Sequence, residues 1–223
     1  MDKHYDKALL PIGSIEQHGK HLPYTTDSLI AEKIVSKIAE KIDCLALPCI
    51  YYGLSQEHEP LFNVSISNDT LSRLINDIAN SLSKQGIKKM FIINGHYGNH
   101  NLLESLPKMI DSMPIYILSY WLVLDEQLGH ADRIETSLML AINPDLVDIS
   151  KAERSLLDID DLILSRLTAL KGSFPKLSKN GVIGDPSNAS REEGELLLNK
   201  ISDRLVDIIK KIDELYIMFC LMD

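Results

Sequence analysis

Residues 10–27 read LPIGSIEQHGKHLPYTTD, and the chain is organised around this stretch. It starts inside a short apolar run, residues 8–12, which predicts a buried strand that the next two residues, Gly-Ser, bring to an end. Shortly after the strand come four side chains of types that bind metals: Glu16, His18, His21 and Asp27. Carboxylate oxygens and imidazole nitrogens together suit zinc, manganese or iron, whereas a purely structural zinc site would recruit thiolates. The stretch therefore predicts a metal site directly after the first strand.

A second strand with ligand-type residues behind it lies further along the chain. Residues 88–93 predict another buried strand, which runs into NGHYGNH at residues 94–100. Glu16 and His18 are two positions apart, so both side chains leave an extended segment on the same side. In an open α/β sheet, ligands bind beyond the carboxyl ends of the strands. We therefore expect Glu16, His18 and Asp27 to converge with His96.

Composition restricts the class of protein. The 223 residues, 45% hydrophobic and 25% charged, favour a single globular domain over 1–223. The net charge of −9 argues against a nucleic-acid partner and against binding to anionic membranes. Three cysteines without a zinc-type spacing favour reduced thiols in a cytoplasmic protein. No apolar run has the length of a membrane span, and the N-terminus lacks a signal-peptide pattern.

The rest of the chain alternates predicted strands and helices, in the manner of an open α/β sheet. The predicted strands cover 8–12, 44–52, 88–93 and 114–120, and the predicted helices cover 28–42, 68–85, 99–110, 129–142 and 191 onward. The second strand is apolar enough to be covered on both faces. Asn68 or Asp69 is the expected cap of its helix, and Ser190 with Glu193 predicts a capping box. The apolar tail 215–219 is expected to pack on the core or on a neighbouring subunit.

Other polar and aromatic residues leave more than one interpretation open. Glu57 and His58 lie in the polar loop 53–60, which either lines a substrate pocket or is a solvated connection. Trp121, the only tryptophan, follows the fourth predicted strand and suits the core, an interface or stacking on a planar ligand. His130 and Glu135 lie at the start of a helix, where each residue alone is more often a cap or a surface residue. Residues 151–179 contain no motif.

Four blocks of sequence occur in the same order as in a known family. They are PIGSIEQHGKHLPYTTD (11–27), INGHYGN (93–99), GHADRIETSLML (129–140) and GVIGDPSNAS (181–190) with a following Glu-Gly. Together they resemble the creatininase family of metal-dependent amidohydrolases. The resemblance implies a three-layer α/β/α sandwich with a mainly parallel central sheet. It also implies two divalent metal ions per chain (zinc, manganese or iron) and a homo-oligomer, a hexamer built from dimers.

The resemblance also assigns roles by position. It implies that Glu16 and His96 bind one metal ion, that His18 binds the other, and that Asp27 bridges both. It implies that His130 transfers a proton near the leaving nitrogen. The remaining candidates are Glu135, as a metal ligand or a proton-transfer group, and the substrate-lining residues Tyr97, Trp121, Glu57 and His58.

Two positions differ from creatininase proper. That enzyme has a metal-binding glutamate where this chain has Gly98, a glycine that the formamide-hydrolysing branch of the family shares. Glu135 is then the nearest carboxylate of the family motifs that could complete the second set of ligands. The other difference is Glu126, which stands in place of an aromatic residue four positions before the histidine. Trp121 compensates for it only if its loop turns the ring inward.

The resemblance and the residues favour hydrolysis of a non-peptide C–N bond, in a cyclic amide or a formamide, by a metal-activated water. His130 or Glu135 would transfer a proton to the leaving nitrogen. Gly98 and Glu126 favour a formamide deformylase acting on a pyrimidine ribonucleotide over creatinine hydrolysis proper, with Lys20, Arg133 and Arg191 as candidate phosphate contacts.

Two other hypotheses stay open. One is a non-catalytic metal- or ligand-binding oligomer with the same fold. The other is a mononuclear hydrolase. In it, Glu16, Asp27 and His96 bind one ion, and His18 contacts a ligand without binding the ion itself.

Overall fold

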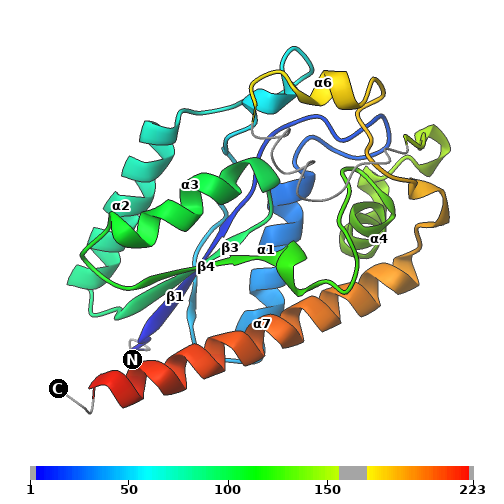
Figure 1. Ribbon diagram of the computed structural model, residues 1–223. Helices are drawn as coiled ribbons and strands as arrows, with labels where there is room; N and C mark the ends of the chain where they lie inside the picture. The colour runs from blue at the N-terminus through cyan, green and yellow to red at the C-terminus, as the bar shows by residue number, and fades with distance from the viewer. Residues whose placement is uncertain (1–3, 156–169, 221–223) are drawn as a thin grey trace.

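The computed structural model describes residues 4–155 and 170–220, the last four of these by their backbone alone. Its centre is a parallel sheet with the strand order β2-β1-β3-β4. Figure 1 shows the strands running side by side between the helices. The strands are β1 (Lys7–Ile12), β2 (Leu45–Ala46), β3 (Lys89–Asn94) and β4 (Ile115–Ser119). The predicted α/β fold with a parallel sheet is confirmed.

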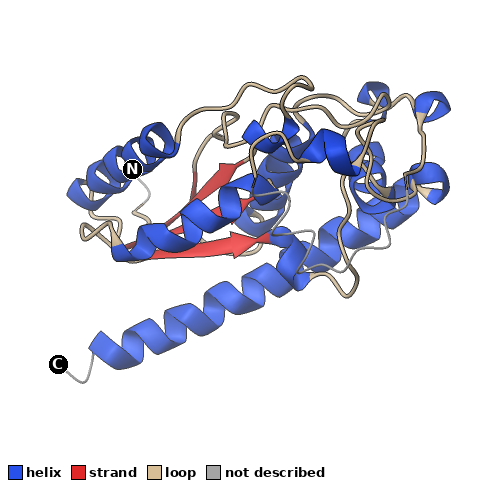
Figure 2. Ribbon diagram, turned by 45° about the horizontal axis from the view of Figure 1, so that its top comes forward, coloured by secondary structure: helices blue, strands red, loops and turns tan. Residues whose placement is uncertain are grey.

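Helices cover both faces of the sheet (Figure 2). They are α1 (Thr26–Ala39), α2 (Asn68–Lys84), α3 (His100–Ser105), α4 (Arg133–Ile142), α6 (Phe174–Leu177) and α7 (Arg191–Cys220). Successive strand residues point to opposite faces, so Leu9 and Phe91 pack in one hydrophobic cluster with α1, α4 and α7. Leu10 and Ile92 pack in the other cluster with α2 and α3. This is the expected three-layer α/β/α arrangement.

The second predicted strand, 44–52, was wrong in its length and in its cover. Only Leu45 and Ala46 form β2, which lies at the edge of the sheet and is partly exposed. Beyond it the backbone still follows β1, because Leu47 N donates to the Leu9 carbonyl and Ile50 N to that of Pro11. At the edge of the sheet a strand is covered less completely than a central strand, and here Leu45 is half-buried and Ala46 is exposed.

Some predicted helix boundaries also differ. The N-cap of α2 is Ser67, whose side chain accepts a hydrogen bond from Thr70 N, and neither Asn68 nor Asp69. The helix predicted over 99–110 ends at Ser105 and continues as a 3-10 turn through Pro107, which lacks the N–H that an α-helix needs.

The predicted capping box at Ser190 is only half formed. Ser190 Oγ accepts from Glu193 N at 3.1 Å, as expected for a cap. The Glu193 carboxylate, however, accepts from Ser137 Oγ of α4, and that same hydroxyl oxygen accepts from Ser190 N. The box is therefore closed through the neighbouring helix.

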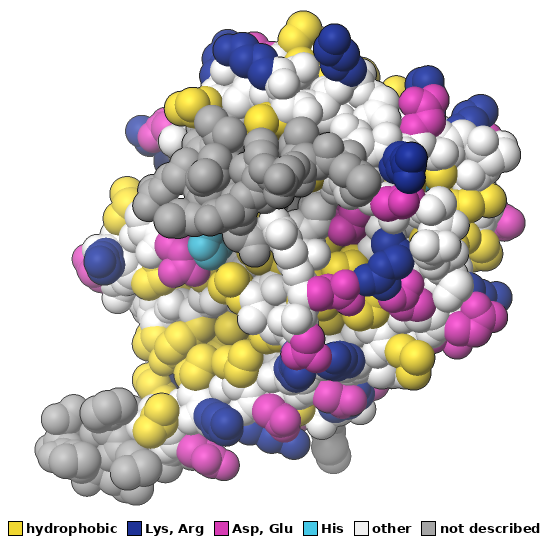
Figure 3. All heavy atoms as spheres, turned by 45° about the vertical axis from the view of Figure 1, so that its right-hand side comes forward, with side chains coloured by type: hydrophobic (Ala, Val, Ile, Leu, Met, Phe, Trp, Pro, Cys, Tyr) yellow, Lys and Arg dark blue, Asp and Glu magenta, His cyan; other side chains and the backbone are white. Residues whose placement is uncertain are grey.

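The C-terminal helix and the charges on the surface bear on two further predictions. In the predicted apolar tail, Leu215 is half exposed and the Lys89 ammonium lies over the Tyr216 ring; the side chains of 217–219 fall outside the described residues. On the face shown in Figure 3, basic side chains are interspersed with acidic ones and form no continuous basic surface. Among the described helices, none combines the length and apolar composition needed to cross a membrane.

Gly95 allows the start of α1 to lie against the end of β3. A Cβ atom at this position would overlap the Asp27 carbonyl oxygen and crowd the Ala31 side chain. We expect Gly95→Ala to lower the free energy of unfolding by about 1–3 kcal/mol, the usual cost of overpacking, and to lower the melting temperature by several degrees. Thermal unfolding followed by circular dichroism measures the change. Ser81→Ala, on the exposed side of α2, should leave the melting temperature unchanged, and an equal loss in both variants would contradict the packing argument.

Candidate metal centre

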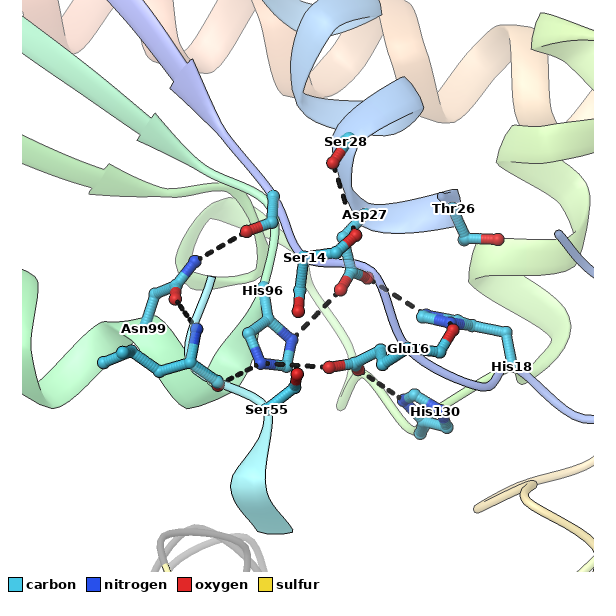
Figure 4. Close-up of polar contacts among 12 residues, drawn as sticks. Ser14, Glu16, His18, Thr26, Asp27, Ser28, Ser55, His96, Asn99 and His130 are labelled. Carbon is cyan, nitrogen blue, oxygen red and sulfur yellow. Dashed lines mark hydrogen bonds and ion pairs between the residues drawn. The ribbon is translucent and has the colours of Figure 1, made fainter. Parts of the chain in front are cut away.

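Buried acidic and imidazole side chains meet beyond the carboxyl ends of β1 and β3. Glu16 and His18 follow β1, Asp27 lies in the first turn of α1, and His96 follows β3. Figure 4 shows these four side chains turned toward one another, with His130 beside Glu16. Each of the four is at most 3% exposed. The structure thus brings together the four side chains that were expected to converge beyond the ends of the parallel strands.

Asp27 lies in the middle of the set and contacts both flanking histidines. Its Oδ1 is 3.0 Å from His18 Nε2, and its Oδ2 is 3.0 Å from His96 Nδ1. Glu16 Oε2 lies 3.2 Å from His96 Nε2, on the other side of that ring. Glu135 Oε2 lies 3.9 Å from His18 Nε2. A carboxylate with one oxygen toward each histidine has the arrangement of a ligand shared by two ions.

Two compact groups of possible ligand atoms share this carboxylate. One consists of Glu16, Asp27 and His96, the other of His18, Asp27 and Glu135. Within each group the ligand atoms lie within 4.8 Å of one another. The oxygen and nitrogen donors suit zinc, manganese or iron.

Backbone carbonyls orient the two flanking histidines. His18 Nδ1 donates to the Glu16 carbonyl at 3.1 Å, which leaves Nε2 facing the carboxylates. His96 Nε2 donates to the Leu54 carbonyl at 2.8 Å, which leaves Nδ1 facing Asp27. Metal-binding histidines usually have such a hydrogen bond on the ring nitrogen that does not bind.

The buried negative charge of the centre also favours the binding of cations. Both Glu16 oxygens and Asp27 Oδ2 are buried without a conventional hydrogen-bond partner, and imidazoles lie beside them. Burial lowers the pKa of His18, but the Asp27 and Glu135 carboxylates outweigh it and raise that pKa to about 10. The pKa of His96 is likewise well above its ordinary value, because Glu16 and Asp27 outweigh burial. Without metal, protons on the imidazoles thus balance the buried negative charge.

The turn before α4 supplies Glu135 and His130. Asp132 caps the helix by accepting from Ile134 N and Glu135 N. Glu135 Oε2 accepts from Ala131 N at 2.6 Å, and burial raises the pKa of this carboxyl to about 8. Burial and the neighbouring His18 and His58 rings hold the pKa of His130 well below its ordinary value. His130 is therefore a neutral imidazole beside the carboxylates.

A cavity opens over the centre, and aromatic rings form part of its wall. Tyr97 and Trp121 stack with their ring centroids 5.1 Å apart, and Phe174 lies beside the His58 ring at 4.3 Å. Of the candidate substrate-lining residues, all four line this cavity: Tyr97, Trp121, Glu57 and His58. The loop after β4 therefore turns Trp121 inward.

Glu57 and His58 belong to the wall of the centre and are not a solvated connection. Glu57 Oε1 lies 3.2 Å from His96 Nε2, and His58 Nε2 lies 3.1 Å from Glu16 Oε1. A Cβ atom at position 98 would overlap the Glu57 carboxylate. The carboxylate of Glu57 thus occupies the space beside Gly98.

His21 and Glu126 lie elsewhere. His21, although it is part of the first motif, forms a hydrogen bond with Thr136 Oγ1 of α4 at 2.9 Å. It belongs to none of the compact ligand groups. Glu126 pairs with Arg133 at the surface. The motif spacing could not separate His21 from the ligand-type residues around it.

The three basic residues considered for phosphate binding also lie away from the cavity. Lys20 pairs with Glu153, Arg191 pairs with Glu195, and Arg133 pairs with Glu126 and Glu193. Among the described residues, no lysine or arginine lines the cavity.

Sequence reasoning missed two residues of the site. Phe174 comes from the segment 151–179, in which no motif was found, and nothing in its local sequence indicates that it reaches the cavity. Gln17 lies between two ligand-type residues, and its amide contacts both His58 and His130. Its position inside the motif was the available signal.

The chain is similar to creatininase and to related proteins. The family model for creatininase, described as creatinine amidohydrolase, matches residues 1–209. The creatinine amidohydrolase of Pseudomonas putida is 26% identical over 91% of this chain and 88% of that protein. The mycofactocin precursor peptide peptidase of Mycolicibacterium smegmatis is 31% identical over 91% of this chain and 84% of that protein.

A third relative covers less of the chain. The 2-amino-5-formylamino-6-ribosylaminopyrimidin-4(3H)-one 5'-monophosphate deformylase of Methanosphaera stadtmanae is 28% identical over 55% of this chain and 53% of that protein. Among solved structures, a creatininase variant of Zn–Zn type has a TM-score of 0.75, is 27% identical, and covers 92% of this chain and 89% of the other. A creatininase structure with manganese in its name has a TM-score of 0.75 at 26% identity, with 92% and 90% covered. The family model and the relatives that span nine-tenths of the sequence show that this chain belongs to the creatininase family of amidohydrolases.

Proposed function

We propose that this protein is an amidohydrolase that uses two divalent metal ions to hydrolyse a non-peptide C–N bond in a small, uncharged amide. The observation that supports this most directly is the shared carboxylate: Asp27 belongs to two compact ligand groups at once. Glu16 and His96 would complete one group, and His18 and Glu135 the other. Solved relatives with Zn–Zn and manganese in their names agree with such a donor set.

The reaction would use the following groups. Two divalent ions held by these residues would supply a water that loses its proton near neutral pH and would polarise the amide carbonyl. His130 lies beside Glu16, with its Nδ1 3.9 Å from Glu16 Oε1, and is neutral because its pKa is well below the ordinary value. It would accept a proton at that nitrogen and return it to the leaving nitrogen of the amide.

Glu57 would form part of the wall of the pocket. Its carboxylate lies against His96 and is nearly buried, so it would contribute negative charge near the first group of ligands. Tyr97, Trp121 and Phe174 would contact the substrate through their ring faces and keep water from the carbonyl.

The cavity favours an unphosphorylated substrate. A phosphate needs positively charged or N–H donors, and the described lining contains no lysine or arginine. The three basic residues considered for that role pair with carboxylates outside the cavity: Lys20, Arg133 and Arg191. We therefore propose a cyclic amide, as in creatinine, or a simple formamide, in preference to a pyrimidine ribonucleotide. The stacked aromatic pair would serve as the flat wall that such a planar amide needs.

Removal of metal tests the proposal. Dialysis against a chelator should reduce amide hydrolysis to background, and adding zinc or manganese should restore it, because the carboxylates and imidazoles alone do not activate water. The measurement combines metal analysis per chain with assays on creatinine, small cyclic amides, formamides, a formamidopyrimidine ribonucleotide and short peptides.

The outcomes separate the hypotheses. About two ions per chain with turnover of a neutral amide supports the proposal, and one ion with full activity supports a mononuclear hydrolase instead. Ligand binding without turnover in the metal-loaded protein would favour a non-catalytic binding protein. Turnover of the ribonucleotide alone would overturn the substrate argument. The same preparation shows by size-exclusion chromatography with light scattering whether the expected hexamer forms.

A further inference from the structure

The amide of Gln17 is held in one orientation. Gly19 N donates to Gln17 Oε1 at 3.0 Å, so the NH2 group must point the other way. Gly181, whose φ is +80°, packs directly on the amide, and a Cβ atom there would overlap Oε1. The side chain is 7% exposed, which leaves little freedom to rotate. The amide nitrogen therefore faces the two histidines beside it.

The first of these histidines is His58. Gln17 Nε2 donates to His58 Nδ1 at 3.1 Å, and an amide nitrogen has no lone pair with which to accept. Nδ1 must then be the unprotonated nitrogen, and Nε2 carries the hydrogen. Nε2 lies 3.1 Å from Glu16 Oε1, an ion-pair distance, while the ring stacks on Phe174.

The second histidine, His130, has its opposite ring edge turned to the carboxylates. Its Nε2 lies 2.9 Å from the Gln17 backbone carbonyl and 3.3 Å from the Gln17 amide nitrogen. The first contact needs a hydrogen on Nε2 and the second needs a lone pair, and the shorter contact to the carbonyl decides between them. The lone pair is then on Nδ1, on the side of Glu16. One histidine therefore presents an N–H to Glu16 and the other presents a lone pair.

Resting on the proposed function, we propose that Gln17 is a positioning residue: its side-chain amide makes His58 present a protonated Nε2 on the side of Glu16, while its backbone carbonyl turns the free nitrogen of His130 to the reaction centre. A consequence concerns a third compact group of possible ligands, Glu16, Glu57 and His58. Because the His58 nitrogen near Glu16 carries a hydrogen, that group does not bind an ion of its own. The protonated edge of His58 faces one oxygen of Glu16, and the other oxygen lies toward His96.

The test is the protonation pattern of the histidine rings in the zinc-loaded protein. Two-bond 1H–15N correlation spectra should show His58 and His130 as the Nε2–H form. Gln17→Met, which keeps the backbone carbonyl but removes the amide, should convert the His58 pattern to an average of both forms and leave His130 unchanged. The matched control is Gln56→Met, on an exposed residue next to the same loop, which should change neither ring.

Zinc affinity gives a second readout that does not depend on turnover. In competition with a chromophoric chelator, Gln17→Met and His58→Ala should bind as many zinc ions per chain as the wild type, with the tighter affinity reduced about 10–100-fold, as for other residues that support a ligand. Loss of one ion in His58→Ala, or an unprotonated Nε2 of His58 in the wild-type spectrum, would overturn the proposal and make His58 a ligand. If the spectra and zinc affinities follow expectation but no amide is hydrolysed, the proposed function fails and the positioning role stands.

Discussion

Asp27→Ala should reduce amide hydrolysis to background and remove metal from both groups of ligands. Asp27 is the one side chain that the two groups have in common, with Oδ1 toward His18 and Oδ2 toward His96. Metal-ion stabilisation of developing charge is worth several kcal/mol, and about 4 kcal/mol corresponds to roughly a thousandfold in rate. We therefore expect kcat to fall by at least about a thousandfold, as measured by steady-state assays beside metal analysis of the same samples.

The protein contains a matched control for this substitution. Asp69 also lies in the first turn of a helix, α2, but it pairs with Arg73 at the surface. Both aspartates interact favourably with a helix N-terminus, an effect of about 0.3–1 kcal/mol, so Asp69→Ala corrects for that loss. It should retain full metal content and activity. Asp27→Asn, which keeps the size of the side chain, should resemble Asp27→Ala; full activity in either Asp27 variant would refute the shared-ligand assignment.

Much of the centre could be predicted from the sequence because its residues follow the ends of parallel strands. Glu16 and His96 follow strands that are neighbours in a parallel sheet, and the carboxyl ends of such strands lie at one edge. Asp27 reaches the same edge because a helix after a parallel strand starts there. Sequence order and the parallel topology were sufficient to place these three side chains together.

Other features depend on tertiary contacts that leave no local signal. His21 has the same residue type and nearly the same position as His18, yet it turns to Thr136 on α4. Phe174 reaches the cavity from a four-residue helix in a segment without periodicity. The length of β2 depends on its place at the edge of the sheet, and its apolar sequence does not report that place. In each case the partner is far away in the sequence, so spacing and composition could not identify it.

Substitution of His130 distinguishes a proton carrier from a metal ligand. If His130 carries protons, His130→Ala should lower kcat by about 10²–10⁴-fold, the usual contribution of general acid–base catalysis, and leave the metal content unchanged. His130→Gln provides the finer comparison, because its amide can still donate to the Gln17 carbonyl that Nε2 of His130 contacts at 2.9 Å, but it cannot carry a proton at neutral pH. Both variants should therefore show the same loss of kcat.

The opposite result has an equally specific structural meaning. His130 forms a compact group with Glu16 and His18, and its free nitrogen is the one on the side of Glu16. If metal analysis of His130→Ala showed one ion fewer per chain, His130 would be a ligand, and the proton would have to pass through Glu135. That carboxyl lies 3.9 Å from His18 and has a pKa raised to about 8 by burial. A loss of activity in His130→Ala with metal retained would instead identify His130 as the proton carrier.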